Sequence, residues 1–140
     1  MKARESIPAP LRLSLSGPAA VHDAVVAACA FAKCAGVDDA NAARLAIVVE
    51  ELAINLYDHG NLSSDDAFEC ELSSNGTDLR FVLRAPGPEF DPWLPVSQRE
   101  PKSTGAGAGL KLVKAWSSGL EHDYTDGQNR LALTMPISGH

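Results

Sequence analysis

Clusters of basic residues are missing from this sequence, and their absence argues against one class of function. Lysine and arginine number 12 against 18 aspartates and glutamates, which gives a net charge of −6 at pH 7. Proteins that hold nucleic acid by its phosphates need a basic surface, and no run of lysine and arginine supplies one here. We therefore expect no nucleic-acid partner.

Long apolar runs and cysteine motifs are scarce as well. No stretch approaches the roughly 20 apolar residues of a membrane-spanning helix. Residues 1–5 are not followed by the apolar core of a signal peptide. The cysteines, Cys29, Cys34 and Cys70, lack Cys-x-x-Cys spacing, so neither a disulfide framework nor a zinc site is expected. The sequence predicts a cytoplasmic protein without a membrane partner, with free and buried thiols.

What remains is the composition of an ordinary folded domain. Hydrophobic residues make up 45% and charged residues 21% of the 140 residues, which is enough for a real core. No internal repeat or low-complexity linker divides the chain. We expect a single domain over residues 1–140, with its core over about residues 9–136.

Periodicity predicts how this domain is organised. Apolar and polar residues alternate in five segments, which predicts strands at residues 11–15, 68–72, 79–83, 120–124 and 131–135. Helical spacing predicts helices from Gly17 to about Cys34, from the N-cap Asp38 to His59, and from Gly109 to Trp116. Long helices beside such strands indicate a two-layer α+β sandwich, with a mixed, mostly antiparallel sheet covered on one face by three helices.

The pairs Asn75–Gly76 and Asp126–Gly127 favour positive backbone φ, so they predict the turns of two hairpins. Between Pro86 and Lys102 the periodicity is lost, and five prolines occur. A loop this long inside a compact domain is usually functional or disordered, so we expect a flexible lid over about residues 86–105.

The predicted second helix carries polar residues on an apolar stripe. Glu51, Asn55 and His59 are spaced by four residues, so they lie along one face beside aliphatic side chains. Polar groups in such a place cost free energy unless they are paired. An asparagine oxygen one turn from a carboxylate can bind Mg²⁺ while the acid orients a nucleophile. The simpler alternative for the Glu51–Asn55 pair is a solvated helix face, and for His59 it is an interaction with the helix end alone. Glu50 is expected to face solvent.

A glycine-rich segment, Gly105-Ala-Gly107-Ala-Gly109-Leu110, opens the predicted third helix. Main-chain N–H groups at a helix start, without Cβ atoms in the way, form a natural anion site. Ser103 and Thr104 are nearby hydroxyl donors, and Lys102 or Lys111 could neutralise phosphate charge. The alternative is a flexible loop that leads into an ordinary helix.

Three segments together resemble the histidine-kinase-like (Bergerat-fold, GHKL) ATPase superfamily over residues 9–136. They are Glu51-Leu-Ala-Ile-Asn55-Leu-Tyr-Asp-His59-Gly60, Ala85-Pro-Gly87-Pro-Glu89-Phe90-Asp91-Pro92 and Gly105-Ala-Gly107-Ala-Gly109-Leu110-Lys-Leu-Val113, and Asn129-Arg130-Leu131 follows near the end. The order and spacing are more specific than any one segment. With no sensor or phosphoacceptor domain attached, the likeness is greatest to stand-alone bacterial anti-sigma factors that act as serine-protein kinases.

The resemblance implies ATP and Mg²⁺ as cofactors and phosphorylation of a serine or threonine on an anti-sigma-factor antagonist. Transcription would then be controlled through protein partners, a sigma factor or its antagonist, and a homodimer is allowed. Glu51 would be the catalytic base and Asn55 the metal ligand. The residues implied at the nucleotide are Asn55, Gly87, Phe90, Thr104, Gly105, Gly107, Gly109 and Leu110.

The middle segment departs from the family pattern. Ala85 stands where the resembled ATPases place an aspartate that accepts a hydrogen bond from the adenine amino group, and Glu89 replaces a usual glycine. Losing a charge-assisted hydrogen bond costs about 1.5–3 kcal/mol, roughly tenfold to a hundredfold in affinity. A second hypothesis is therefore a degenerate ATPase fold that sequesters a sigma factor or antagonist, with weak or no nucleotide binding. A third is an unrelated α+β domain whose motifs match by coincidence.

Overall fold

The computed structural model describes residues 7–94 and 106–139, which form three helices and five strands. The elements are β1 (Leu11–Leu15), α1 (Ala20–Cys34), α2 (Asp39–Asp58), β2 (Phe68–Ser74), β3 (Asp78–Pro86), α3 (Ala106–Trp116), β4 (Ser118–Thr125) and β5 (Gln128–Pro136). Their order along the chain agrees with the order predicted from periodicity. The three motif segments thus lie at the end of α2, at the end of β3 and beyond it, and at the start of α3.

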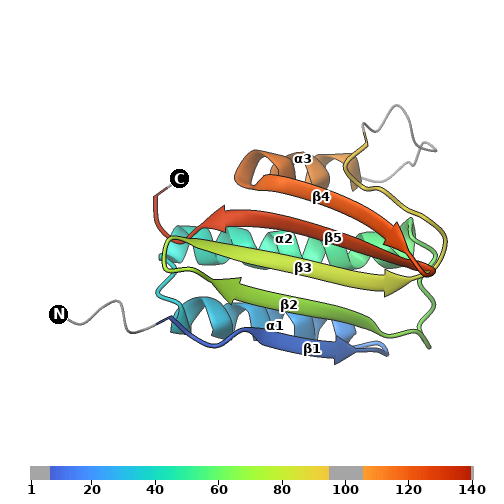
Figure 1. The fold of residues 1–140 in the computed structure, drawn as a ribbon, viewed down its shortest axis with the longest axis horizontal. Helices are drawn as coiled ribbons and strands as arrows, with labels where there is room; N and C mark the ends of the chain where they lie inside the picture. The colour runs from blue at the N-terminus through green and yellow to red at the C-terminus, as the bar shows by residue number, and fades with distance from the viewer. Residues whose placement is uncertain (1–6, 95–105, 140) are drawn as a thin grey trace.

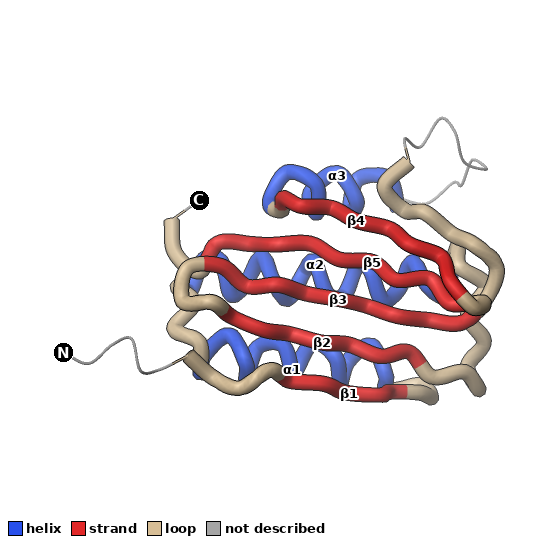
Figure 2. Tube along the Cα trace, viewed as in Figure 1, coloured by secondary structure: helices blue, strands red, loops and turns tan. Residues whose placement is uncertain are grey.

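The five strands form one sheet in the order β1-β2-β3-β5-β4, and every pairing is antiparallel. The helices lie on one face of this sheet and leave the other face open (Figures 1 and 2). This arrangement confirms the predicted two-layer α+β sandwich. Within the described residues the sheet has no parallel pair.

Alternation in the two central strands builds the core. The inward-facing residues of β3 and β5 are buried: Leu79, Phe81, Leu83 and Ala85 on one strand, and Asn129, Leu131, Leu133 and Met135 on the other. They pack against the buried stripe of α2, whose members include Leu45, Val48 and Leu52. Burial of this apolar surface, at roughly 25 cal/mol per Å², is the main stabilising term of such a domain.

Local signals fix where the elements begin. Asp38 caps α2 as predicted, because its Oδ1 accepts a hydrogen bond from the Asn41 main-chain N–H at 2.8 Å. Two predicted starts were wrong. The first helix begins at Ala20, since Gly17 adopts a φ of +89° and closes a turn first. The third begins at Ala106 and not at Gly109, so Gly107 and Gly109 lie inside its first turns.

The cysteines correct another prediction. Cys70 is buried in β2, and burial raises the pKa of its thiol to about 12. Cys29 and Cys34, however, are exposed, because they lie off the stripe that α1 buries against the sheet. Buried thiols were therefore a correct expectation for one of the three.

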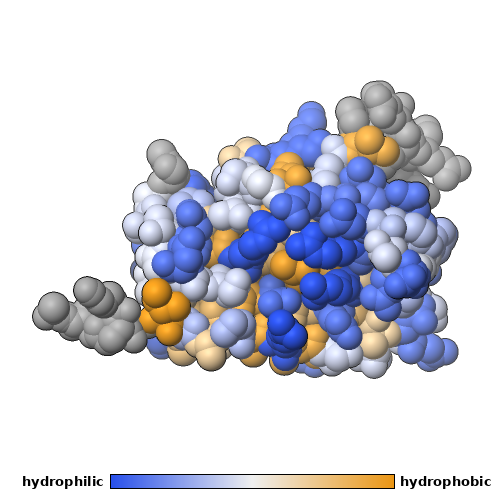
Figure 3. All heavy atoms as spheres, viewed as in Figure 1, coloured by the Kyte–Doolittle hydropathy of each residue, from blue (hydrophilic) through white to orange (hydrophobic). Residues whose placement is uncertain are grey.

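The open face of the sheet is polar and charged across most of its surface (Figure 3). Arginines on the central strands face carboxylates on their neighbours, with Arg80 3.0 Å from Glu121 and Arg130 2.9 Å from Asp123. Exposed ion pairs of this kind contribute about 0–1 kcal/mol each. None of the described helices is long and apolar enough to cross a membrane.

Candidate functional site

The motif residues gather at one end of the molecule. The last turns of α2, the end of β3, the end of β4 and the start of β5 all meet there (Figure 1). The register of the sheet places Ala85 of β3 directly beside Asn129 of β5. Segments that are far apart in the sequence thus share one region of the fold.

Asn55 lies on the buried stripe of α2 and is 2% exposed. Its Nδ2 group donates to the main-chain carbonyl of Glu51 at 2.7 Å. Its Oδ1 atom is buried and has no hydrogen-bond partner among the described residues. A buried acceptor without a partner costs about 1–3 kcal/mol, so this oxygen suits a cation or an external donor.

Glu51 lies one helical turn before Asn55 and is half-buried. The pKa of its carboxyl is raised above the ordinary value, first by burial and then by the charges of Glu50 and Asp58. The group is therefore a stronger proton acceptor than a free glutamate. Such an acceptor thus lies one helical turn before Asn55, whose side-chain oxygen has no partner among the described residues.

Gly109 of α3 lies against the Glu51 carboxylate. A Cβ atom added at Gly109 would overlap the Oε1 and Cδ atoms of Glu51. A side chain at this position would displace the Glu51 carboxylate, so the close approach and not a positive φ distinguishes this glycine. The first N–H groups of any α-helix lack partners within the helix, and in α3 they include those of residues 106–108. The Glu51 carboxylate therefore lies beside the first turn of α3.

Gly87 and Phe90 pack at the end of α2. Gly87 has a φ of +133°, and a Cβ there would come within 3.1 Å of the Gly60 carbonyl oxygen. The Phe90 ring is buried beside Gly60 and stacks on His59, with centroids 6.3 Å apart. Gly60 in turn donates its N–H to the main-chain carbonyl of Asn55 at 3.0 Å. The middle motif is thus joined to the Asn55 turn.

The other predicted residues fall into two groups. Leu110 is 2% exposed and packs in the core, and Gly107 belongs to the first turn of α3. Thr104 and Gly105 lie outside the described residues, as do Ser103 and Lys102. The predicted lid is described only to Leu94, so its mobility stays a prediction. Ala85 is 2% exposed and offers no acceptor.

Sequence reasoning missed a set of contacts that hold the segment after β3. Asn129, which is 2% exposed, accepts a hydrogen bond from the Phe90 N–H at 2.8 Å and donates to the Pro88 carbonyl at 2.9 Å. The Tyr124 hydroxyl donates to the Gly87 carbonyl at 2.8 Å. The signal for Asn129 was present, because it is the polar member of an inward-facing series that continues with Leu131 and Leu133.

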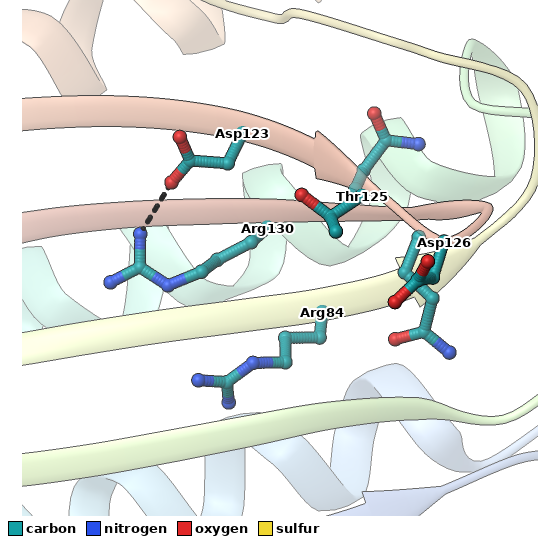
Figure 4. Close-up of a pocket in the computed structure, with 7 residues that line it drawn as sticks. Arg84, Asp123, Thr125, Asp126 and Arg130 are labelled. Atoms are coloured by element: carbon teal, nitrogen blue, oxygen red, sulfur yellow. Dashed lines mark hydrogen bonds and ion pairs between the residues drawn. The ribbon is translucent and has the colours of Figure 1, made fainter.

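A hollow also lies on the open face of the sheet. It measures about 450 Å³ and is lined by Arg84, Asp123, Thr125, Asp126, Gln128, Asn129 and Arg130 (Figure 4). Arg130 is already paired with Asp123 across it. Opposite charges along its walls offset each other, and of the motif residues only Asn129 and Arg130 are among those that line it. We therefore do not assign the activity to this hollow.

Metal chemistry at the site would not rest on a side-chain cluster. Within residues 7–94 and 106–139, no group of three or more histidines, cysteines, aspartates or glutamates could hold a metal ion. The oxygen of Asn55 is a single ligand, so a bound ion would take its remaining ligands from water and phosphate, as Mg²⁺ commonly does.

Comparison with known proteins agrees with this geometry. A family model described as the histidine kinase-like ATPase domain matches residues 16–135, which contain all the elements from α1 to β4 and nearly all of β5. No match was found among curated proteins. A match over most of the chain excludes coincidental motifs, and the chain belongs to the histidine kinase-like ATPase domain family.

Proposed function

We propose that this domain binds ATP with Mg²⁺ and phosphorylates a serine or threonine of a protein partner, as an anti-sigma-factor kinase that regulates transcription. The observation that carries the proposal is the buried Oδ1 of Asn55, which has no partner among the described residues. It lies one helical turn after Glu51, whose carboxylate lies against Gly109 of α3. Membership of the ATPase domain family supports the nucleotide. The partner would be a sigma factor's antagonist, with the sigma factor itself as a second partner.

The residues present fit the phosphate end of the nucleotide and its cation. Asn55 would hold Mg²⁺ through the oxygen that has no partner in the described residues. The N–H groups at the start of α3, those of residues 106–108, would bind phosphate oxygens, helped by the positive end of the α3 dipole. When bound, Mg²⁺ supplies charge neutralisation and polarisation of the phosphoryl oxygens.

Glu51 would accept the proton in the transfer step. The partner's hydroxyl oxygen forms a bond to the γ-phosphorus, and the bond from that phosphorus to the bridging oxygen breaks. ADP leaves with the electron pair, and the hydroxyl proton moves to Glu51. Such proton transfer typically contributes about 10²–10⁴ in rate, and it is most effective when the pKa of the base lies near the working pH. The raised pKa of Glu51 is in that direction.

The part of the site where the adenine would lie favours a second candidate function. Ala85 is buried among apolar residues and cannot accept from an adenine amino group. The nearest polar side chain across the sheet, Asn129, already uses both ends of its amide on residues 88–90. A binding module that sequesters its protein partner, with weak or absent nucleotide binding, is the alternative that this observation supports.

Calorimetric titration with ATP separates the two functions at the level of binding. We expect micromolar binding that requires Mg²⁺, and we expect Asn55→Leu to abolish it. The variant should remain folded, because leucine of similar size removes the unpaired buried acceptor, and this offsets the loss of the Nδ2 hydrogen bond to the Glu51 main-chain carbonyl. Absence of binding by a folded wild-type protein would leave only the binding module.

Phosphotransfer is tested with labelled ATP and candidate antagonists. Glu51→Gln should keep nucleotide affinity within a few-fold and reduce transfer by about 10²–10⁴. The matched control is Glu69→Gln, which changes an exposed glutamate on β2. Tight ATP binding together with no transfer to any antagonist would reject the kinase and keep the nucleotide site.

A further inference from the structure

The amide of Asn129 has its orientation fixed by the main chain. A main-chain N–H can only donate and a carbonyl can only accept. Because the Phe90 N–H lies 2.8 Å from Oδ1 and the Pro88 carbonyl 2.9 Å from Nδ2, the two ends cannot be exchanged without losing both hydrogen bonds. The oxygen of Asn129 therefore faces His122.

That orientation also fixes the tautomer of His122. The imidazole Nε2 lies 2.9 Å from Asn129 Oδ1, an atom that only accepts, so Nε2 must carry a hydrogen. The ring is almost fully buried, with its side chain 8% exposed, and its other nitrogen, Nδ1, lies 3.7 Å from the Asp91 carboxylate. A neutral ring turns a bare lone pair toward that carboxylate, whereas a protonated ring turns an N–H toward it.

We propose that Asp91, His122 and Asn129 form a proton-dependent relay that positions the 88–91 turn at the nucleotide site. Protonation of Nδ1 adds an attraction between β4 and Asp91, and Nε2 holds the Asn129 oxygen that receives the Phe90 N–H. His122 is thus a positioning residue that acts through Asn129. Its effect on nucleotide affinity rests on the proposed function, whereas its effect on the turn does not.

The 88–91 turn is in contact with the end of α2. The Phe90 ring packs on Gly60 and stacks on His59, and Gly60 donates its N–H to the Asn55 carbonyl. A turn that moves away from β5 would take Phe90 away from the helix end that presents Asn55. Firmer attachment of the turn should therefore favour the arrangement in which this end of the site is complete.

The charges around the ring make Asp91 the group to test. Among the described residues, Asp91 is the charged side chain within ion-pair distance of the imidazole. His59 lies across Phe90, and Lys114 of α3 donates to the Trp93 carbonyl farther along the segment. Glu121 and Asp123 flank His122 on β4, but they pair with arginines on the open face.

Amide hydrogen exchange at Phe90 tests the relay without nucleotide. The protection factor of this amide should rise as the pH falls from about 8 to 5, in step with protonation of His122 followed by NMR in the same sample. His122→Phe should lower the protection about tenfold, since one buried hydrogen bond to Asn129 is lost. The control is His22→Gln, at an exposed position on α1.

Two conservative variants separate the relay from simple packing. His122→Gln can still donate to Asn129 but cannot titrate, so it should keep the protection and lose the pH dependence. Asp91→Asn should lose the pH dependence as well. A neutral ring with its proton on Nδ1, or Phe90 protection that responds to pH equally in wild type and both variants, would overturn the relay.

Nucleotide titration of the same proteins adds an arm that tells the two proposals apart. ATP affinity of the wild type should follow the pH dependence of Phe90 protection, and His122→Gln should remove that dependence. Absence of ATP binding would refute the proposed function while the exchange result still decides the relay. Tight ATP binding with a pH profile unchanged by His122→Gln would refute the link between relay and site.

Discussion

Three asparagines are buried among the described residues, and comparing them shows where the structure departs from the needs of folding alone. Asn41 donates to the Gly139 carbonyl at 2.9 Å, and Asn129 binds the main chain of residues 88–90. Both amides therefore join distant segments. Asn55 is the one whose oxygen is buried and unpaired in the described part of the chain. The Asn55 oxygen therefore contributes no hydrogen bond to the described fold, and a bound ligand best explains why a polar atom is buried there.

Glu51 gives a pH prediction at the same scale. Its pKa is raised above 4.5 in the folded protein, so the folded state binds the proton more tightly than the unfolded state. The free energy of unfolding contributed by this group is highest below its unfolded pKa and is lost as the pH rises through its folded pKa. Urea denaturation should therefore show wild type losing stability relative to Glu51→Gln as the pH rises above the ordinary glutamate pKa of about 4.3.

Glu69→Gln is the control for this experiment, since Glu69 is exposed on β2. The difference between wild type and that control should change little over the same range. A wild type that instead gains stability over Glu51→Gln as the pH rises would mean that Glu51 is stabilised as a carboxylate, against the burial seen here.

At the scale of elements, periodicity and turn residues predicted the architecture well. The Asp38 cap is confirmed, and positive φ values at Gly76, Asp126 and Gly127 confirm the two turns. These features are local, so the sequence within a few residues specifies them. The start of α3 was misjudged because glycine has low helix propensity, while packing against α2 favours a helix that includes two glycines.

The site was only partly predictable, because some of its contacts join elements that are far apart in the sequence. The sequence pointed to Glu51, Asn55 and Gly109 by spacing and resemblance, and the structure brings them together. It gave no sign that His122 and Tyr124 hold the segment after β3, since these contacts depend on how β4 pairs beside β5. Pairing across a sheet is not encoded within a short stretch of sequence.

The approach of α3 to α2 gives the prediction at this scale. Gly109→Ala would normally stabilise a helix by about 1 kcal/mol. Here the added Cβ meets the Glu51 carboxylate, so we expect the variant to lose stability. In a Glu51→Ala background the carboxylate is gone, and the same substitution should become stabilising.

A double-mutant cycle by thermal or urea denaturation measures this coupling directly. The coupling energy should be about 1 kcal/mol or more, with the sign of the Gly109→Ala effect reversed between the two backgrounds. Equal effects in both backgrounds would show that the two helices do not approach each other as closely as described.

At the scale of the whole molecule, the fold divides its two faces between different tasks. The open face of the sheet carries arginines and carboxylates that largely neutralise one another, whereas Glu51, Asn55 and Gly109 belong to the helical layer. The helical side brings the end of α2, the start of α3 and the segment after β3 to one end. Ligand binding there joins three elements, so it should stabilise the whole domain.

This linkage makes Ala85→Asp informative. Without nucleotide, a carboxyl at this 2% exposed position should lower the melting temperature, because an unpaired buried acid is costly. With ATP and Mg²⁺, the new acceptor can pair with the adenine amino group, and affinity should rise about tenfold or more. Binding to the folded state alone then restores stability by RT ln(1 + [ATP]/Kd), which thermal shift measures.

GTP is the matched ligand, since guanine has a carbonyl in place of that amino group. An equal gain in affinity for GTP, or no gain for ATP, would show that Ala85 does not lie beside the adenine ring.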